Sequence, residues 1–185
     1  MDALAALTTR VSPAALDAPG PSADALDTIL RAAVAAPDHG RMQPWRFILI
    51  DGIAREKFGA LLAETLQRRE PAAPVGKLDA ERRKALRAPL IVVVAAAVQP
   101  GAKVPEVEQV VAVGAAAQNM LVAAHALGYG GFWRTGANAY DAAMKRALGL
   151  AESDVIVGFL YLGTTKTPGQ PRQNDIASVT RRWAG

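Results

Sequence analysis

Apolar residues recur at helical spacing in several segments of the chain. The clearest segment is residues 22–36, where one side of a helix carries Ala25, Leu26, Ile29, Leu30 and Ala33. Ser22 can accept a hydrogen bond from the first free backbone N–H groups, and Pro37 stops the helix. The other predicted helices cover residues 2–9, 54–70, 77–87, 106–127 and 139–149. The charges of residues 77–87 are expected to form a solvated face.

Other segments have the β-branched character of strands. Residues 89–97, PLIVVVAAA, form a continuous apolar run that predicts a strand buried on both faces. Residues 46–51 and 154–163 predict two further strands, and residues 130–136 a short strand or turn. Strands are few, and strict strand–helix alternation is missing. The order favours a single α+β domain over residues 1–185, with a small central sheet flanked by helices.

The longest apolar stretch, residues 110–128, could be mistaken for a membrane span. Gln118, Asn119 and His125 interrupt it, and alanine dominates over leucine. We therefore expect a buried core helix, ended by Gly128, and no membrane partner. The first residues lack the basic region of a signal peptide, so a cytoplasmic protein is expected.

Composition narrows the chemistry further. The 185 residues include no cysteine and two histidines far apart, which argues against thiol catalysis and against a metal site. A net charge of +4 suits an anionic small molecule. No lysine and arginine stripe is interleaved with aromatic residues, so no nucleic-acid partner is expected.

Two common types of site, a glycine-rich dinucleotide-binding loop and a hydrolase triad, do not match the sequence. The sequence GYGGFW, residues 128–133, begins like a dinucleotide fingerprint but has Trp133 in place of its last glycine and follows a helix. Asp38 and His39 supply hydrolase residue types, but adjacent residues cannot easily form an acid–imidazole pair, and no G-x-S-x-G elbow exists. No other acid partner for His39 is evident.

Three clusters remain. In RVS, residues 10–12, the arginine and the hydroxyl could bind a phosphate. Alternatively, the arginine only interacts favourably with the dipole at the end of the preceding helix. APDHGRMQPW, residues 36–45, could be a loop that binds a ligand. Alternatively, His39 is hydrogen-bonded to the backbone and Trp45 packs in the core. In GGFWRTG, residues 130–136, two glycines permit close approach of a flat ligand or a backbone. Arg134 there is a lone charge that calls for an anionic partner.

These three clusters, together with VGFLYLGT near the end, resemble the FMN-dependent nitroreductase family over nearly the whole chain. The likeness is greatest to its small branch of NAD(P)H nitroreductases. The resemblance implies the nitroreductase α+β fold and an intertwined homodimer. It also implies two FMN sites at the dimer interface, each lined by both chains.

The resemblance also assigns residues to the cofactors. The FMN positions are Arg10, Val11, Ser12, Ala35, His39, Gln43, Pro44, Trp133, Arg134 and Thr135. Arg10 and Ser12 would hold phosphate or ribityl oxygens, His39 would come from the partner subunit, and Arg134 would bind phosphate. Gln43 and Pro44 would run along the isoalloxazine ring. The stretch that matches an NAD(P)H segment is Ala123, Ala124, His125, Ala126, Leu127 and Gly128.

The chain departs from the family pattern at three places. Val11 and Ala35 stand where the family has basic residues, and a further basic residue is missing from PAAL, residues 13–16. The residues that could compensate are Arg41, Arg181 and Arg182.

The implied activity is a ping-pong oxidoreductase. NADH or NADPH would reduce FMN, and an acceptor such as a nitroaromatic or quinone would reoxidise it. No catalytic side chain is assigned, and Trp45 and Trp133 could wall the site or belong to the core. Two alternatives are an FMN-binding dimer with a storage role and a structural dimer without cofactor.

Overall fold

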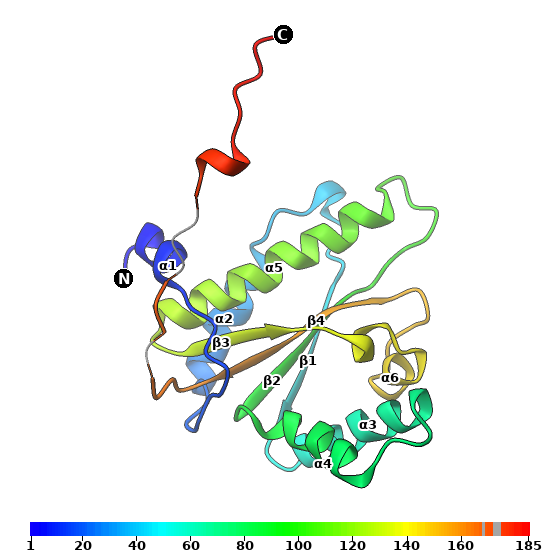
Figure 1. Cartoon of the computed structure of the whole chain (residues 1–185). Coiled ribbons are helices and arrows are strands. Elements are labelled where there is room, and N and C mark those ends of the chain that lie inside the picture. Colours follow the sequence, from blue (N-terminus) through cyan, green and yellow to red (C-terminus); the bar gives the residue numbers. More distant parts are fainter. Residues whose placement is uncertain (168, 172–174) are drawn as a thin grey trace.

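A four-stranded antiparallel sheet forms the centre of the molecule. We analysed a computed structural model, which describes residues 1–167, 169–171 and 175–185. The strands are β1 (Trp45–Asp51), β2 (Leu90–Ala96), β3 (Gly130–Arg134) and β4 (Val155–Gly163), in the order β1-β2-β4-β3. Helices cover both faces of this sheet (Figure 1). The predicted α+β architecture is confirmed.

One face of the sheet packs against α2 (Ala23–Val34) and α5 (Glu106–Ala126), with α1 (Ala3–Thr9) beside the end of α5 (Figure 1). By length and composition alone α5 could cross a membrane. In the fold it is a core helix: Val113, Met120 and Leu121 are buried against the sheet. Its small residues allow close packing, as predicted. It ends before Gly128, whose φ of 87° fits the predicted glycine stop.

The opposite face packs against α3 (Ala54–Arg69) and α6 (Ala142–Ala147), and α4 (Val75–Arg83) packs against the outer side of α3. The rings of Phe58 and Phe159 join α3 to the sheet, with their centroids 5.7 Å apart. Because helices cover both faces, β2 is buried along its whole length, which explains its unbroken apolar run.

The charged helix differs from the prediction in one respect that matters for the site. α4 starts at Val75 and ends at Arg83, and a 3₁₀ turn, Lys84–Leu86, follows it. Most of its charges are exposed, but Glu81 is 9% exposed and faces inward. The prediction of a wholly solvated face is therefore wrong at Glu81, because this carboxylate is satisfied by hydrogen bonds from Asn138 and Lys84.

Candidate functional site

The loop between α2 and β1 has a strained backbone. Gly40 has a φ of 71°, but Arg41 and Gln43 also have positive φ, at 55° and 49°. Such angles are uncommon for residues with a side chain and often mark functional loops. Asp38 helps to hold the shape, because its carboxylate accepts a hydrogen bond from the Gln43 backbone N–H at 2.6 Å. Pro44 is buried at the end of the loop, where its carbonyl accepts from Ala97.

His39 has an acid partner after all. Its Nδ1 is hydrogen-bonded to the carboxylate of Glu108, in the first turn of α5. Sequence reasoning missed this pair because the two residues are distant along the chain. Both side chains are largely exposed, so the pair lies at the surface, beside a hollow lined by Pro37, Val107 and Val111.

Arg10 and Ser12 form a preformed polar pair after α1. The Arg10 guanidinium donates to the Ser12 hydroxyl at 3.0 Å and to the Val11 carbonyl at 3.2 Å. They line a cavity of about 810 Å³, together with Val11 and Pro13. Both members of the pair remain accessible, as a phosphate contact requires.

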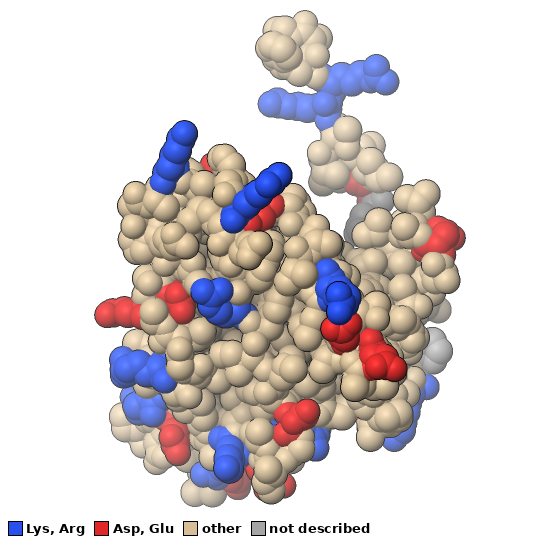
Figure 2. Space-filling model, turned by 180° about the vertical axis from the view of Figure 1, so that it is seen from behind, with Lys and Arg blue, Asp and Glu red and all other residues tan. Residues whose placement is uncertain are grey.

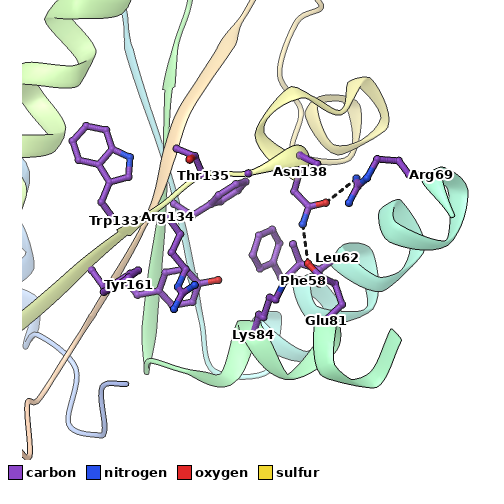
Figure 3. Close-up of a pocket in the computed structure, with 14 residues that line it drawn as sticks. Phe58, Leu62, Arg69, Glu81, Lys84, Trp133, Arg134, Thr135, Asn138 and Tyr161 are labelled. Carbon is purple, nitrogen blue, oxygen red and sulfur yellow. Dashed lines mark hydrogen bonds and ion pairs between the residues drawn. The ribbon is translucent and has the colours of Figure 1, made fainter. Parts of the chain in front are cut away.

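The strand β3 presents alternate residues to opposite faces of the sheet. Trp133 joins the core beside α5, where its Nε1 donates to the Val157 carbonyl at 3.2 Å. Phe132 joins the core on the α3 side, and Arg134 follows it there. Figure 3 shows Trp133 and Arg134 on opposite sides of the strand. Of the two roles expected for Trp133, its indole takes the one in the core.

The two glycines of β3 make room for side chains. A Cβ on Gly130 would lie 2.4 Å from Leu16 and 2.1 Å from Thr165, and one on Gly131 would lie 2.6 Å from Leu121. The sequence predicts that a flat ligand or a backbone approaches these two glycines closely. In the structure, neighbouring side chains do so instead.

Arg134 lies over the ring of Phe132, with its guanidinium carbon 4.3 Å from the ring centroid. Burial lowers the pKa of Arg134, and the positive charge of Arg87 lowers it further. In the described part of the chain, Arg134 forms no ion pair. The anionic partner predicted for it is therefore not a carboxylate of these residues.

A cavity of about 440 Å³ opens beside Arg134 (Figure 3). Phe58, Phe132, Phe159 and Tyr161 give it aromatic walls, and residues 133–137 form another side. Burial raises the pKa of the Tyr161 hydroxyl, so it stays neutral. An aromatic hollow with a free cation is suited to a flat, electron-rich or anionic ligand.

A polar network holds the far wall of this cavity. The buried Asn138 accepts hydrogen bonds from Thr65 at 2.9 Å and Arg69 at 3.0 Å, and donates to Glu81 at 3.2 Å. Arg69 also pairs with Asp141, at 3.5 Å. These contacts join α3, α4 and the segment after β3, and so fix the cavity's shape.

The predicted site residues fall into two groups at opposite ends of α5. His39 contacts Glu108 at the start of the helix, whereas Thr9, next to Arg10, bonds His125 at its end, at 2.9 Å. At a rise of about 1.5 Å per residue, these two ends are about 25 Å apart. The structure brings Arg10 and Ser12 near the start of β3, where Pro13 lies against Gly130, and leaves His39, Gln43 and Pro44 in another region.

The remaining predicted residues lie as follows. The stretch 123–128 covers the last turn of α5 and the two residues after it. Ala124 is buried, the His125 ring is hydrogen-bonded to the Thr9 hydroxyl, and Ala126, Leu127 and Gly128 are exposed. Ala35 caps α2 and is exposed, as are Thr135 and Arg41. Arg181 and Arg182 lie on the terminal segment that stands away from the body (Figure 2).

Sequence reasoning missed the polar residues that line this cavity beside Arg134, which are Arg69, Glu81, Lys84, Asn138 and Tyr161. Their types carry no motif. The one available signal is the charge density of residues 77–87, which by itself indicates a solvated face.

Comparison with known proteins identifies the family. The model of the nitroreductase family matches residues 7–164. The chain belongs to the nitroreductase family. The Escherichia coli K12 protein YdjA, named as a candidate NAD(P)H nitroreductase, is 44% identical over 168 residues, which cover 89% of this chain and 88% of YdjA. The resemblance predicted from the motifs is confirmed.

Solved structures share the fold. A nitroreductase-like family protein from Bacillus cereus has a TM-score of 0.85 at 25% identity, covering 100% of this chain and 97% of that one. A candidate nitroreductase from Desulfovibrio desulfuricans, in complex with FMN, has a TM-score of 0.77 at 25% identity, with 100% and 98% covered. The predicted nitroreductase-like fold is confirmed.

Proposed function

We propose that this protein is an FMN-dependent oxidoreductase that takes electrons from NADH or NADPH and reduces a small acceptor, such as a nitroaromatic or a quinone, in a ping-pong reaction. Its family membership, the name of its relative YdjA and the FMN complex of the Desulfovibrio protein support the proposal. The observation that carries it is the aromatic cavity beside the free guanidinium of Arg134.

The residues present fit FMN, which joins a flat ring to an anionic phosphate. Arg10 and Ser12 offer a charged fork and a hydroxyl to the phosphate or the ribityl oxygens. The aromatic cavity beside Trp133, Arg134 and Thr135 offers walls to the ring. When bound, FMN would supply the redox chemistry, accepting electrons from NAD(P)H and passing them to the acceptor.

The chain's own residues would bind and orient the reactants. Phe132 and Tyr161 would exclude water from the covered part of the ring, while Arg134 would supply positive charge beside it. No side chain is assigned a proton transfer. The exposed residues Ala126, Leu127 and Gly128 stay the proposed NAD(P)H contact, because the rest of that stretch is engaged in packing α1 and the core.

We also propose that the working form is a homodimer with FMN at its interface. The loop carrying His39, Gln43 and Pro44 is about 25 Å along α5 from the Arg10 end, so one cofactor contacts both groups only if two chains supply them. The start of α5 also exposes Val107 and Val111, at 66% and 64%. A second copy of the chain would cover this apolar strip. The cytoplasmic location predicted from the sequence is kept as part of the proposal.

The dimer is tested by light scattering on wild type and on Val111→Lys. We expect the wild type to have twice the chain mass and the variant to dissociate and lose FMN. A wild-type monomer that binds FMN at full affinity would refute the shared site.

The activity is tested by the visible spectrum of protein saturated with FMN and desalted. We expect a flavin band that NADH or NADPH bleaches under anaerobic conditions and that a quinone restores. Colourless protein would refute the proposal. A bound flavin that neither nucleotide bleaches would instead support the FMN-storage alternative.

A further inference from the structure

The two histidines of the chain are each held through one ring nitrogen. Nδ1 of His39 is hydrogen-bonded to the carboxylate of Glu108, and Nε2 of His125 to the hydroxyl of Thr9 at 2.9 Å. Within the described part of the chain, the second nitrogen of each ring has no hydrogen-bond partner. The two partners differ in kind, and each determines which nitrogen of its histidine carries the proton.

The carboxylate of Glu108 selects one tautomer of His39. An ionised carboxylate only accepts hydrogen bonds, so Nδ1 must carry a proton. Glu108 lies in the first turn of α5, where the helix dipole favours a negative charge. In the neutral ring, the free Nε2 therefore has the lone pair and is a hydrogen-bond acceptor. The two nitrogens lie on opposite edges of the imidazole, so this acceptor is turned away from Glu108.

Thr9 selects the opposite tautomer of His125. The single hydroxyl proton of Thr9 is donated to the carbonyl of Ala5 at 2.7 Å. The Thr9 oxygen can therefore only accept from His125, which places a proton on Nε2 of that ring. The protein thus contains an internal reference, because its two neutral histidines are expected to be opposite tautomers.

The start of α5 also fixes the surface beneath the His39 loop. Gln109, the residue after Glu108, is 1% exposed and donates to the carbonyl of Val104 at 3.0 Å. A Cβ on Gly40 would lie 2.9 Å from the Val104 side chain, so the loop rests directly on this fixed segment. Exposed ion pairs usually gain little, because ordering two long side chains costs entropy. Here the backbone on both sides of the pair is already ordered, so the imidazole can be held in one orientation.

We propose that Glu108 is a positioning residue, which holds His39 as its Nδ1–H tautomer and presents Nε2 as an acceptor to the flavin bound by the partner subunit. This inference rests on the proposed function, including its dimer, and gives a role to a residue that the resemblance did not assign. FMN has two kinds of donor for such an acceptor, the N–H of its pyrimidine ring and its ribityl hydroxyls. The contact would complement Arg10 and Ser12, which offer donors to the phosphate.

The tautomers are tested by the NMR shifts of the ring nitrogens, recorded at alkaline pH before and after FMN is added. His125→Asn assigns the two sets of signals. We expect wild-type His39 to have its proton on Nδ1 and His125 to have its proton on Nε2. Adding FMN should shift the Nε2 signal of His39, and Glu108→Ala should convert His39 alone to a mixture of tautomers. A wild-type His39 with its proton on Nε2 would refute the inference.

FMN titration tests whether this orientation is used. For Glu108→Ala and for His39→Ala we expect the dissociation constant to rise about fivefold, as for the loss of one hydrogen bond. The double variant should bind no more weakly than either single variant, because both remove the same contact. Glu108→Gln keeps an accepting oxygen and should recover part of the loss. Glu106→Ala is the matched control, because Glu106 is an acid of the same helical turn that does not bond His39 in the described structure.

Lumiflavin, which has the ring without the ribityl chain, separates the two donors. An effect of Glu108→Ala that persists with lumiflavin assigns the contact to the ring N–H, and one confined to FMN assigns it to a ribityl hydroxyl.

The outcomes separate this inference from the proposed function. A wild-type protein that does not bind FMN refutes the proposed function, although its histidine tautomers can still be measured. If the wild type binds FMN and Glu108→Ala leaves the affinity unchanged, the function stands and the inference is wrong. It is equally wrong if the effects of Glu108→Ala and His39→Ala simply add. Thermal unfolding and light scattering confirm that folded protein of the same assembly is compared.

Discussion

Replacing Gly158 with alanine tests how the sheet positions the site. Gly158 lies on β4 opposite Val94, and a Cβ there would meet Trp133 Nε1 at 2.1 Å and Cδ1 at 2.7 Å. It would also lie 3.1 Å from the carbonyl of Arg134. The indole must therefore move, and with it the hydrogen bond to Val157 and the backbone that leads into the cavity.

The magnitude follows from two terms. Overpacking of a core position costs about 1–3 kcal/mol, and loss of the Trp133 hydrogen bond adds about 1 kcal/mol. The free energy of unfolding should thus fall by about 2–4 kcal/mol, which lowers Tm by roughly 10 °C in a domain of this size. FMN affinity should fall as well, since Trp133 cannot shift without moving Arg134.

The assay is urea or thermal unfolding of the purified protein, with FMN titration alongside. The matched control is Gly76→Ala, because Gly76 is exposed in α4 and a Cβ there meets nothing within 4 Å. The free energy of unfolding of Gly76→Ala should rise by about 0.5–1 kcal/mol. Adding Trp133→Phe to Gly158→Ala should recover part of the loss. A Gly158→Ala protein within 1 kcal/mol of wild type would refute the reasoning.

Three further outcomes are expected. Asn138→Ala removes the hydrogen bonds that join α3, α4 and the segment after β3. It should lower the free energy of unfolding, measured by urea titration, by about 3 kcal/mol and weaken FMN binding. An unchanged urea midpoint would contradict this role of Asn138. Ser22→Ala removes the N-cap of α2 and should cost about 1 kcal/mol with FMN affinity unchanged, as measured in the same titration. Burial raises the pKa of Tyr161, so its contribution to stability is present below its ordinary pKa of about 10 and is lost as pH rises above that value. Wild type should therefore lose Tm between pH 9 and 11 more steeply than Tyr161→Phe, and equal slopes would argue against this cause.

The local elements were predictable because their signals are local. The run Leu90–Ala96 has no polar interruption, and β2 is buried on both faces as that run requires. Ser22 caps α2, and glycines with positive φ follow α5 and α6 at Gly128 and Gly149. Each feature depends on residues within a few positions of one another.

The cavity was not predictable, because its walls meet only in the folded chain. Charged residues of a short helix all resemble a solvated face, and nothing in the sequence distinguishes Glu81 from its exposed neighbours. Its burial depends on Asn138, a residue in a loop after β3.

The loop at residues 36–45 shows how a correct sequence signal can have an incomplete explanation. Its unusual composition indicated a ligand loop, yet in the single chain its residues lie far along α5 from Arg10 and β3. Positive φ at Arg41 and Gln43 costs about 1 kcal/mol or more at each position. Within the chain, Asp38 holds this shape by accepting hydrogen bonds from the backbone N–H groups of Arg41 and Gln43. Strain of this kind persists where it serves a contact. The proposed dimer would give this loop such a contact, with the partner subunit's cofactor, and the light-scattering and FMN measurements on Val111→Lys test that arrangement.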